Sequence, residues 1–420
     1  MKRLRLPTHT GYDLTLLLVV LGLLAIGLAM VYSASGIKAL DTMDDPRYFL
    51  IQQSAWVAIG LAAMLVVARI DYHRYRRLAV PALLIAIVLL VLVLIPGVGT
   101  RVGGASRWLR VSSFAGLQPA ELAKLALVLY LAFWLGAKRE AVGRWSVTVP
   151  FVAVLTLVAG LVVAEPDLGT AIVLGAIGLA MYFVAGARVA EFAALGGLAT
   201  ICVAAVAVVQ PYRLARLETF LDPWSDPQGA GFQTIQSIYG LALGGPLGEG
   251  LGAGKEKFGF LPAAYTDSIF AVLGNELGLI GTLTVVVLFL VVGFKGIRIA
   301  LSAPDVAGAL LATGVTVWLV FQAWVNMAVV ASLVPMTGIT LPFISYGGSS
   351  ICVGLVAVGI LLNVGRQAVA GANDRAPVRG AARGRGDRRP RQPAARGGGG
   401  ARRPGDRRAP VHRGPSRPRG

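Results

Sequence analysis

Charged residues, cysteines and histidines are scarce in this chain of 420 residues, and each shortage excludes a class of protein. Only 14% of the residues are charged while 56% are hydrophobic, a combination that soluble globular chains rarely show. The two cysteines, Cys202 and Cys352, both lie inside apolar runs, which argues against a disulfide framework and a cysteine metal site. The three histidines are far apart in the sequence, so we expect no zinc centre and no other protein-bound metal cluster.

The formal net charge of +18 is concentrated at the C-terminus. From Arg366 to Gly420 there are sixteen arginines, no lysine and three aspartates, a net charge of +13, which leaves +5 for the rest of the chain. This segment is rich in Arg, Gly and Pro and cannot bury a core, so we expect a disordered cytoplasmic tail over 367–420. Because it has no aromatic residues to stack on bases, we favour contact with anionic membrane lipids over an RNA-binding arm, and no nucleic-acid partner is expected.

Long apolar runs dominate what remains, and they predict an all-α, polytopic membrane protein with ten transmembrane helices. A basic segment, 1–12, precedes the first run, which we interpret as a retained span and not a cleaved signal peptide. The predicted bundle covers 13–366, with spans at about 13–34, 50–69, 78–96, 117–136, 147–164, 167–186, 189–210, 268–294, 305–332 and 341–365.

The distribution of Lys and Arg in the short loops predicts cytoplasmic N- and C-termini and one large extracytoplasmic loop, 211–267. A loop of this length is usually functional or disordered, and its mixture of aromatic, aliphatic and glycine residues predicts that it folds back onto the bundle. The loop 97–116 departs from the charge trend, since Arg101, Arg107 and Arg110 would lie outside. Basic residues retained there are candidates for binding an anion.

A phosphate-binding loop is suggested by "GEGLGAGKE" (248–256) but is rejected. The pattern requires glycine where Glu249 stands and serine or threonine where Glu256 stands. We therefore expect no nucleotide and no organic cofactor.

Polar residues inside the fourth predicted span share one helical face. Gln118, Glu121 and Lys124 are spaced by three, and charged residues within a span normally face a bundle interior or a water-filled cavity. A Glu121–Lys124 ion pair could simply stabilise helix packing. Because Arg107 and Arg110 lie just outside the same helix, we favour a polar cavity wall.

Three further polar stretches lie at predicted span ends. In "AEPDLGTA" (164–171), Glu165 and Asp167 suit a capped tight turn and an active site equally well. In "GITLPFISYGGSS" (338–350), Ser345 and its neighbours suit close helix packing and a binding surface equally well. Asp267, in "YTDS", suits a helix N-cap, and spacing alone favours that structural role.

Six stretches of the chain resemble the SEDS family of membrane peptidoglycan glycosyltransferases, which includes FtsW and RodA. They occur in the family's order and cover the whole bundle, leaving only the arginine-rich tail outside. The stretches are "GGASRWL" (103–109), "QPAELAKLALVLYLA" (118–132), "EPDLGTA" (165–171), "FQTIQSIYGLALGG" (232–245), "FGFLPAAYTDSIFAVLGNELGLIG" (258–281) and "GITLPFISYGGSS" (338–350).

Within the family the chain is more similar to the FtsW branch, on the evidence of "TGITLPFISYGGSS" and "KEKFGFLPAAYTD". It departs from the common pattern at Tyr265, where the family often has His, and at Asn275, where the family usually has Glu. Neither change removes Asp267 or Glu276, but both concern the neighbourhood of Asp267.

The resemblance implies that the protein joins lipid II units into β-1,4 glycan strands on the outer membrane face and releases undecaprenyl diphosphate. It assigns Asp267 as the catalytic general base, which would take a proton from the acceptor sugar hydroxyl. The anionic leaving group requires cations, for which Arg107, Arg110 and Lys124 are candidates, with a divalent cation (Mg or Mn) as a candidate helper. The substrate-binding residues that the resemblance implies are Arg107, Arg110, Glu121, Lys124, Gln233, Gln236, Ser237 and Ser345.

The family also implies partners and a location. We expect lipid II as substrate, a class B penicillin-binding protein (an FtsI-like transpeptidase) and other division proteins as partners, and a place in the bacterial inner membrane at the division septum. Three alternatives stay open: a lipid II flippase, a non-catalytic scaffold for the transpeptidase, and an elongation (RodA-type) or sporulation polymerase.

Overall fold

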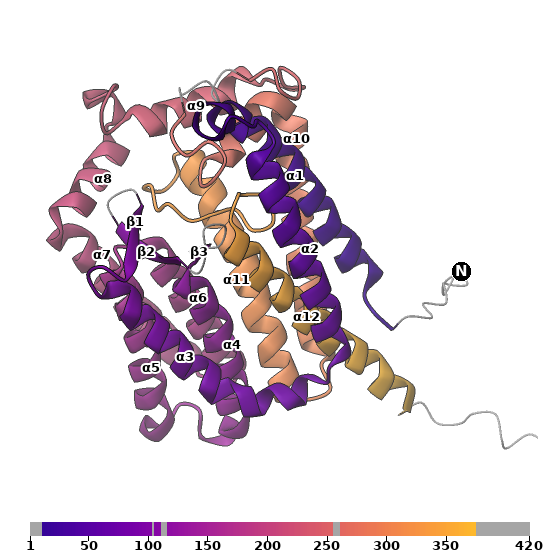
Figure 1. Cartoon of the computed structure of the whole chain (residues 1–420). Helices are drawn as coiled ribbons and strands as arrows, with labels where there is room; N and C mark the ends of the chain where they lie inside the picture. The colour runs from indigo at the N-terminus through magenta and orange to yellow at the C-terminus, as the bar shows by residue number, and fades with distance from the viewer. Residues whose placement is uncertain (1–10, 103–104, 111–115, 255–260, 375–420) are drawn as a thin grey trace, which may run out of the picture. The chain divides into compact units, whose positions relative to one another are not determined.

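The computed structural model describes residues 11–102, 105–110, 116–254 and 261–374 as a helical bundle with a small sheet (Figure 1). The predicted tail beyond residue 374 and most of the N-terminal segment lie outside these residues. The helices of the described part are α1 (Leu14–Met43), α2 (Tyr48–Arg69), α3 (Arg76–Leu94), α4 (Pro119–Ala137), α5 (Trp145–Ala164), α6 (Leu168–Val184), α7 (Val189–Val209), α8 (Pro211–Leu221), α9 (Phe232–Leu243), α10 (Ile269–Ser302), α11 (Val306–Val330) and α12 (Gly348–Asp374).

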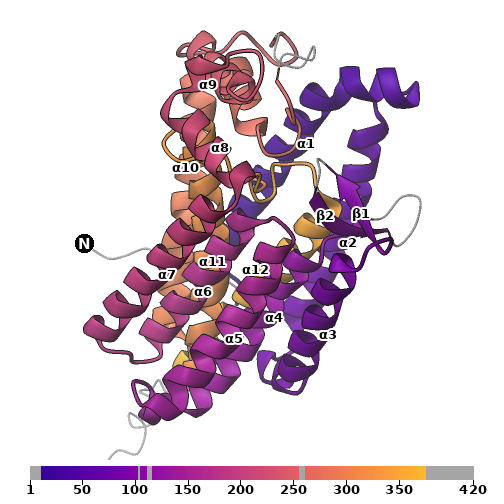
Figure 2. The same ribbon diagram turned by 90° about the vertical axis from the view of Figure 1, so that its left-hand side faces the viewer.

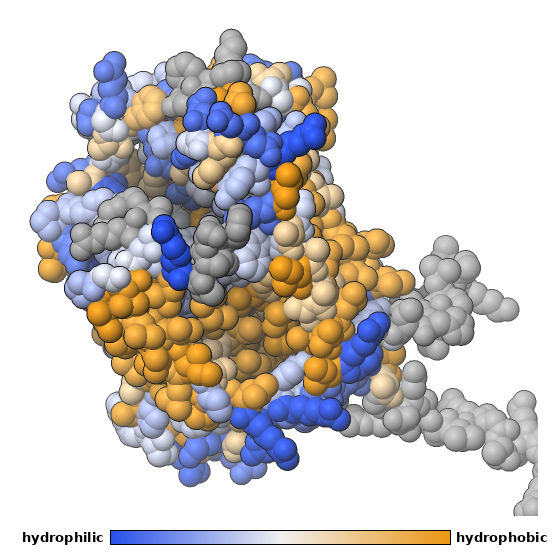
Figure 3. All heavy atoms as spheres, in the orientation of Figure 1, coloured by the Kyte–Doolittle hydropathy of each residue, from blue (hydrophilic) through white to orange (hydrophobic). Residues whose placement is uncertain are grey.

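Nine helices in the described ranges are long and apolar enough to cross a membrane. The one remaining predicted span, 167–186, corresponds to α6, which is apolar but only 17 residues long. Figure 3 shows hydrophobic side chains forming a band between hydrophilic ends, as expected for a surface that meets lipid. The protein is therefore a multi-pass membrane protein.

Helices α4, α11 and α12 form the centre of the bundle, since most of their residues are buried. Helix α11 packs on α4, α6, α10 and α12, and α12 packs along α2. Helix α7 is the opposite case, with no buried residue among 189–209. It extends from α6 to α8 at the margin of the bundle (Figures 1 and 2).

Aspartates define where three of the spans begin. Asp13, Asp167 and Asp305 each accept a hydrogen bond from a backbone N–H in the first turn of α1, α6 and α11. These bonds satisfy N–H groups that would otherwise lack partners at the helix end. The capping role that the sequence allowed for Asp167 is thus present, which leaves any catalytic role of this residue untested.

The structure corrects the predicted fold at two places. The loop 97–116 contains a three-stranded antiparallel sheet in the order β1 (Gly99–Val102), β2 (Ala105–Arg110), β3 (Gly116–Leu117), which the all-α prediction missed. The last span begins at Gly348 and not at 341, because the chain from 331 to 347 is not helical. This segment is called the 331–347 loop below. The predicted large loop 211–267 contains α8 and α9.

Helix α10 is broken at Gly278, which adopts φ 64° and ψ −161°. The loop before α10 supplies backbone hydrogen bonds at the break: Glu249 N–H donates to Asn275 O at 2.9 Å, and Leu279 N–H donates to Gly245 O at 2.9 Å. A backbone of this shape is essentially restricted to glycine. The break therefore depends both on Gly278 and on the close approach of the 244–250 segment.

We expect Gly278→Ala to lower the apparent melting temperature in detergent, with a destabilisation of about 2 kcal/mol or more. A Cβ atom at this position would lie 2.3 Å from Gly248 N, so the loop or the helix must shift. Gly22→Ala in α1 is the matched control, because its Cβ meets no atom within 4 Å. Equal melting temperatures for the two variants would contradict this account of the break.

Candidate active site

Asp267 lies two residues before the start of α10. Its Oδ1 accepts a hydrogen bond from the Thr266 hydroxyl at 3.1 Å, and its backbone carbonyl accepts one from Asn326 Nδ2 at 2.8 Å. The side chain remains partly exposed. The N-cap position of α10 belongs to Ser268 and not to Asp267, so the capping role suggested by "YTDS" is absent.

The 331–347 loop positions Asp267 through buried polar side chains. Asn326 Nδ2 also donates to Ile339 O at 2.8 Å, which ties the loop and the backbone of Asp267 to α11. Ser345 Oγ donates to Thr266 O at 2.5 Å and accepts from Leu341 N–H at 2.8 Å. Ser345 is 3% exposed, so in this structure it joins two segments of the site. Its predicted contact with substrate stays a prediction.

Arg107 on β2 faces the same point as Asp267. A Cβ atom on Gly338 would lie 3.8 Å from Asp267 Oδ2 and 3.9 Å from Arg107 Nη1. The guanidinium is oriented by backbone carbonyls, since Nε donates to Glu165 O at 3.1 Å and Nη2 donates to Pro166 O. A glycine between a carboxylate and a guanidinium keeps the space between them open. The structure thus brings together two residues predicted from distant parts of the sequence.

The charges around Asp267 act in opposite directions on its proton affinity. Burial raises the pKa of the Asp267 carboxyl above its ordinary value. The hydrogen bond from Thr266 and the positive charges of Arg216 and Arg107 lower the same pKa, but by less than burial raises it. Asp267 is therefore a stronger base than an exposed aspartate.

Glu165 is a second carboxyl of the site whose pKa is raised. It is 1% exposed, and neither carboxylate oxygen has a hydrogen-bond partner among the described residues. Burial, and secondarily the negative charge of Asp167, raises its pKa to about 8, although Arg107 opposes the shift. Asp167 itself accepts hydrogen bonds from Thr170 N–H at 3.0 Å and from the Thr170 hydroxyl at 2.9 Å.

Two arginines of α8, Arg213 and Arg216, add to the positive charge of the site and were not predicted. Arg213 is 7% exposed and donates to Val163 O at 2.9 Å. Burial and the charge of Arg107 both lower its pKa. Arg216 donates to Met336 O at 3.1 Å and to the Tyr212 hydroxyl. Their i, i+3 spacing in "PYRLARLETF", within the loop expected to fold back, was the available signal.

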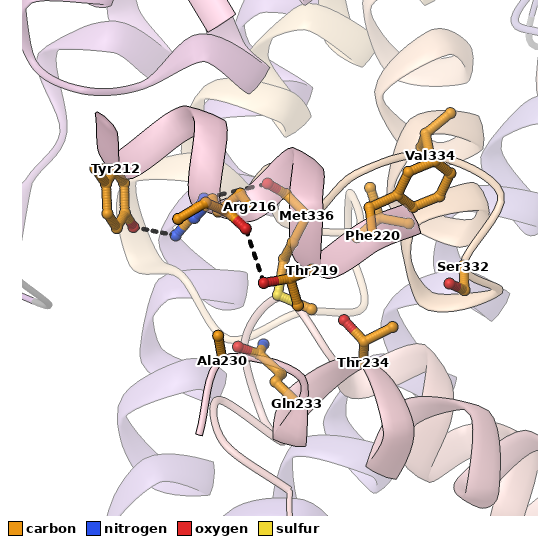
Figure 4. Close-up of a pocket in the computed structure, with 12 residues that line it drawn as sticks. Tyr212, Arg216, Thr219, Phe220, Ala230, Gln233, Thr234, Ser332, Val334 and Met336 are labelled. Carbon is orange, nitrogen blue, oxygen red and sulfur yellow. Dashed lines mark hydrogen bonds between the residues drawn. The ribbon is translucent and has the colours of Figure 1, made fainter. Parts of the chain in front are cut away.

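A cavity of about 300 Å³, lined by both polar and apolar side chains, opens between α8, α9 and the 331–347 loop (Figure 4). Arg216, Tyr212 and Gln233 line it, and Gln233 Nε2 also donates to Ser268 Oγ at 3.0 Å, next to Asp267. Of the other predicted residues of α9, Gln236 is partly exposed, whereas Ser237 is buried and donates to Gln233 O at 2.8 Å. The structure therefore places Gln233 at a cavity wall.

Glu121 and Lys124 are buried in a closed network. Lys124 Nζ lies 2.7 Å from Glu121 Oε1 and 2.7 Å from Gln322 Oε1, and 5.0 Å from the ring centre of Trp318. Gln322 Nε2 in turn donates to Thr340 O at 2.9 Å. In this structure the ion pair supports the 331–347 loop through Gln322, which is the structural role that the sequence left open. The predicted contact of Glu121 and Lys124 with substrate stays a prediction. Arg110 is exposed on β2, and its role also stays a prediction.

The described residues do not fit a protein-bound divalent cation. They contain no group of three or more His, Cys, Asp or Glu side chains placed to hold a metal ion. Asp167 directs both oxygens to Thr170, and the charges nearest Asp267 are guanidinium groups. The divalent cation named as a candidate helper therefore stays a prediction.

The chain matches the model of the FtsW/RodA/SpoVE family, described as "Cell cycle protein", over residues 14–369. It is 45% identical over 354 residues to a Trichlorobacter lovleyi protein named "Probable peptidoglycan glycosyltransferase FtsW", which covers 84% of this chain and 93% of that protein. It is 43% identical over 358 residues to Stage V sporulation protein E of Bacillus subtilis, covering 85% of this chain and 98% of that protein.

Solved structures are similar over the same region. One, described as "Structural coordination of polymerization and crosslinking by a peptidoglycan synthase complex", has a TM-score of 0.70 at 31% identity and covers 85% of this chain and 98% of its own. The rod shape determining protein RodA of Thermus thermophilus has a TM-score of 0.63 at 28% identity, covering 86% of this chain and 99% of its own. With the family match spanning the bundle and these relatives aligned over nearly their whole length, the chain belongs to the FtsW/RodA/SpoVE family.

Proposed function

We propose that this protein polymerises lipid II into β-1,4 glycan strands and releases undecaprenyl diphosphate. The observation that carries the proposal is the pairing of Asp267 and Arg107 across Gly338. The names of the FtsW relatives support the same activity. In this proposal the end of the bundle that carries α8, α9 and the sheet is the extracytoplasmic end.

Asp267 acts as the general base in this reaction. A sugar hydroxyl is a weak nucleophile at neutral pH, so a carboxylate that accepts its proton as the glycosidic bond forms lowers the barrier. Direct displacement at an α-linked diphosphate inverts the anomeric centre and gives the β-linked product. Inversion requires one base and no covalent intermediate, which agrees with a single carboxylate facing open space at Gly338.

Arg107, with Arg213 and Arg216, stabilises the departing diphosphate. Backbone carbonyls already orient all three guanidiniums, so little reorganisation is needed as negative charge develops on the leaving group. Each arginine has five N–H donors and uses only some of them in these contacts. The remaining donors match the oxygens of a diphosphate.

Glu165 preserves the charge of Arg107 by staying protonated at neutral pH. An ionised carboxylate at this position would neutralise part of the positive charge that the leaving group requires. Because burial holds the Glu165 pKa at about 8, its carboxyl is mostly neutral at neutral pH. The two carboxyl groups therefore have different tasks, one taking a proton and one keeping it.

The relatives also support a place in cell-wall synthesis. We propose that the partner is a class B penicillin-binding protein, because a similar solved structure is described as coordinating polymerisation and crosslinking. The similarity to proteins named FtsW favours the division septum over the side wall. Localisation of a fluorescent fusion to mid-cell would support division, and localisation to the side wall would support elongation.

We expect Asp267→Asn to abolish polymer formation from labelled lipid II, with a rate loss of at least about 100-fold, because an amide cannot accept the hydroxyl proton. The assay uses purified protein together with its class B partner. In the wild type, the rate should also fall as the pH falls through the raised pKa of Asp267, since protonation removes the base.

Asp222→Asn is the matched control, because Asp222 is an exposed carboxylate of the loop before α9 and should leave the rate unchanged. If Asp267→Asn and the wild type form equal amounts of polymer, Asp267 is not the base, and Glu165, Asp167 and Glu276 become the candidates. No polymer from the wild type with its partner present would favour the flippase or the scaffold. A flippase should tolerate Asp267→Asn better than Lys124→Ala.

We expect Glu165→Gln to melt at a higher temperature than the wild type near pH 8, with the difference disappearing near pH 5. The folded carboxyl, with a pKa of about 8, must hold a proton that the unfolded chain releases above its ordinary pKa of 4.5. The stability contributed by neutral Glu165 is thus fully present below the unfolded pKa and is lost as the pH rises toward the folded one. The loss is at most about 1.4 kcal/mol per pH unit.

Glutamine is neutral throughout this range, so its variant lacks the pH dependence. Glu218→Gln, at an exposed position of α8, controls for a general effect of removing one carboxylate. Melting temperatures of the three proteins in detergent from about pH 5 to 9 make the comparison. Parallel curves for wild type and Glu165→Gln would show that Glu165 is ionised in the folded protein.

A further inference from the structure

Gln53, in the second turn of α2, holds one end of the 331–347 loop. Its side chain is 1% exposed, and its amide bonds the loop backbone at two points. Nε2 donates to Ser345 O at 3.1 Å, and Oε1 accepts from Gly347 N–H at 3.3 Å. One buried amide thus satisfies both a carbonyl and an N–H group of the 345–347 segment, and either group would be costly to leave unpaired.

This end of the loop in turn holds the backbone that carries Asp267. Ser345 Oγ donates to Thr266 O at 2.5 Å. Tyr346 N–H donates to Tyr265 O at 2.9 Å. Both acceptors belong to the two residues that directly precede Asp267, so a movement of this end of the loop would also move the carboxylate. A continuous path of hydrogen bonds therefore runs from α2 to the candidate base.

Side chains next to Gln53 on α2 pack against the same two segments of the chain. The ring centre of Phe49 lies 5.0 Å from that of Tyr265 and 5.1 Å from that of Tyr346. The Tyr346 hydroxyl also donates to Gln52 Oε1. Within this contact the rings supply packing, and Gln53 supplies the hydrogen bonds to the loop backbone.

Backbone strain in the loop explains why it needs to be held. Phe343 adopts φ 66°, in the left-handed region that residues other than glycine rarely occupy. Such a conformation persists only where the surrounding contacts determine it. On the α1 side the approach is close, since a Cβ atom on Gly27 would lie 2.3 Å from Phe343 O. The loop is thus held from α1, from α11 through Asn326, and from α2 through Gln53.

We propose that Gln53 is a positioning residue for Asp267, which it fixes through the 345–347 segment. The inference rests on the proposed function, because it takes Asp267 as the base. Gln53 is buried and both ends of its amide are bonded to the loop, so it acts on the carboxylate and not on the substrate. A general base must lie within hydrogen-bond reach of the proton that it takes, which makes the rate sensitive to small displacements of Asp267.

Gln53→Met removes both hydrogen bonds and keeps the approximate length of the side chain. We expect kcat for polymer formation from lipid II to fall by about 10- to 100-fold, because a misplacement of about 1 Å can cost that much. The KM for lipid II should change little, since no substrate contact is removed. The assay uses purified protein together with its class B partner.

The acid side of the pH–kcat profile should move to lower pH in Gln53→Met. Burial raises the pKa of the Asp267 carboxyl, whereas Thr266, Arg216 and Arg107 lower it. Release of the segment before α10 would admit water to the carboxylate and reduce the contribution of burial. Asp267 would then stay ionised to a lower pH than in the wild type.

Asn363→Leu is the matched control, because Asn363 makes the same pair of bonds at the other end of α2. Its side chain is fully buried, Nδ2 donates to Ala68 O at 2.7 Å, and Oδ1 accepts from Tyr72 N–H at 3.1 Å. Asn363→Leu should lower the melting temperature much as Gln53→Met does, with kcat and the pH profile unchanged. If Gln53→Met is folded and matches Asn363→Leu in kcat and in pH profile, the proposal is overturned while the polymerase function stands.

A shorter amide guards against misfolding of Gln53→Met. Gln53→Asn keeps a neutral hydrogen-bonding group, but the two bonds are already 3.1 and 3.3 Å long, so a side chain one carbon shorter cannot keep both. We expect a smaller loss of melting temperature, with kcat and the pH profile changed in the same direction as for Gln53→Met. A folded Gln53→Asn variant with the kcat and pH profile of the wild type would contradict the positioning role.

Hydrogen–deuterium exchange of the full-length protein without substrate tests the contact independently of turnover. The N–H groups of Tyr346 and Gly347 should exchange about tenfold faster or more in Gln53→Met than in Asn363→Leu, because local opening of the loop becomes easier. Asn363→Leu should instead exchange faster at Tyr72.

The exchange measurement separates this proposal from the proposed function. Faster exchange at the loop in Gln53→Met, together with a wild type that makes no polymer, would reject the proposed function and leave Gln53 as the residue that holds this segment. Equal exchange at Tyr346 and Gly347 in the two variants would overturn the proposal, whatever the polymer assay shows.

Discussion

Backbone N–H and C=O groups need hydrogen-bond partners in an apolar medium, and this requirement governs the structure. The candidate site depends on how the 331–347 loop meets the requirement. This segment is not helical although it lies between two membrane helices, so its carbonyl groups need partners from elsewhere. Asn326 and Gln322, both buried in α11, donate to Ile339 O and Thr340 O. The same Asn326 amide holds the backbone of Asp267, so supporting the loop and placing the carboxylate are one arrangement.

The charged network under the loop is explained by the same constraint. Lys124 donates a hydrogen bond to the side-chain oxygen of Gln322, and Glu121 neutralises the charge of the lysine. A chain of buried polar contacts therefore runs from α4 through α11 to the 331–347 loop. A buried ion pair in an apolar interior needs such additional hydrogen bonds to offset the cost of removing it from water. In this structure Glu121 and Lys124, which were expected to line a cavity, support the loop that lies next to Asp267.

Electrostatic asymmetry is the second feature of the site. Arg107, Arg213 and Arg216 come from β2 and α8, and Asp267 is the carboxylate that faces Arg107 across Gly338. Burial keeps Glu165 mostly protonated at neutral pH. The excess of positive charge suits an anionic leaving group, and two of these arginines, Arg213 and Arg216, line an apolar cavity between α6, α7, α8 and α11. A lipid diphosphate has both properties in one molecule.

The sequence by itself determined the membrane class, nearly all of the spans and the family, because apolar length and local motifs are properties of contiguous residues. It also named Asp267 and Arg107, which the structure brings close to the same glycine, Gly338. It began the last helix at 341, because Pro342 and the Gly347-Gly348 pair are compatible with a loosened helix as well as with a loop. It also missed the sheet at 99–117. Only the tertiary structure decided that Arg213 and Arg216 join the site and that Lys124 is enclosed. Each of these depends on contacts between segments distant in the chain, which no local pattern encodes.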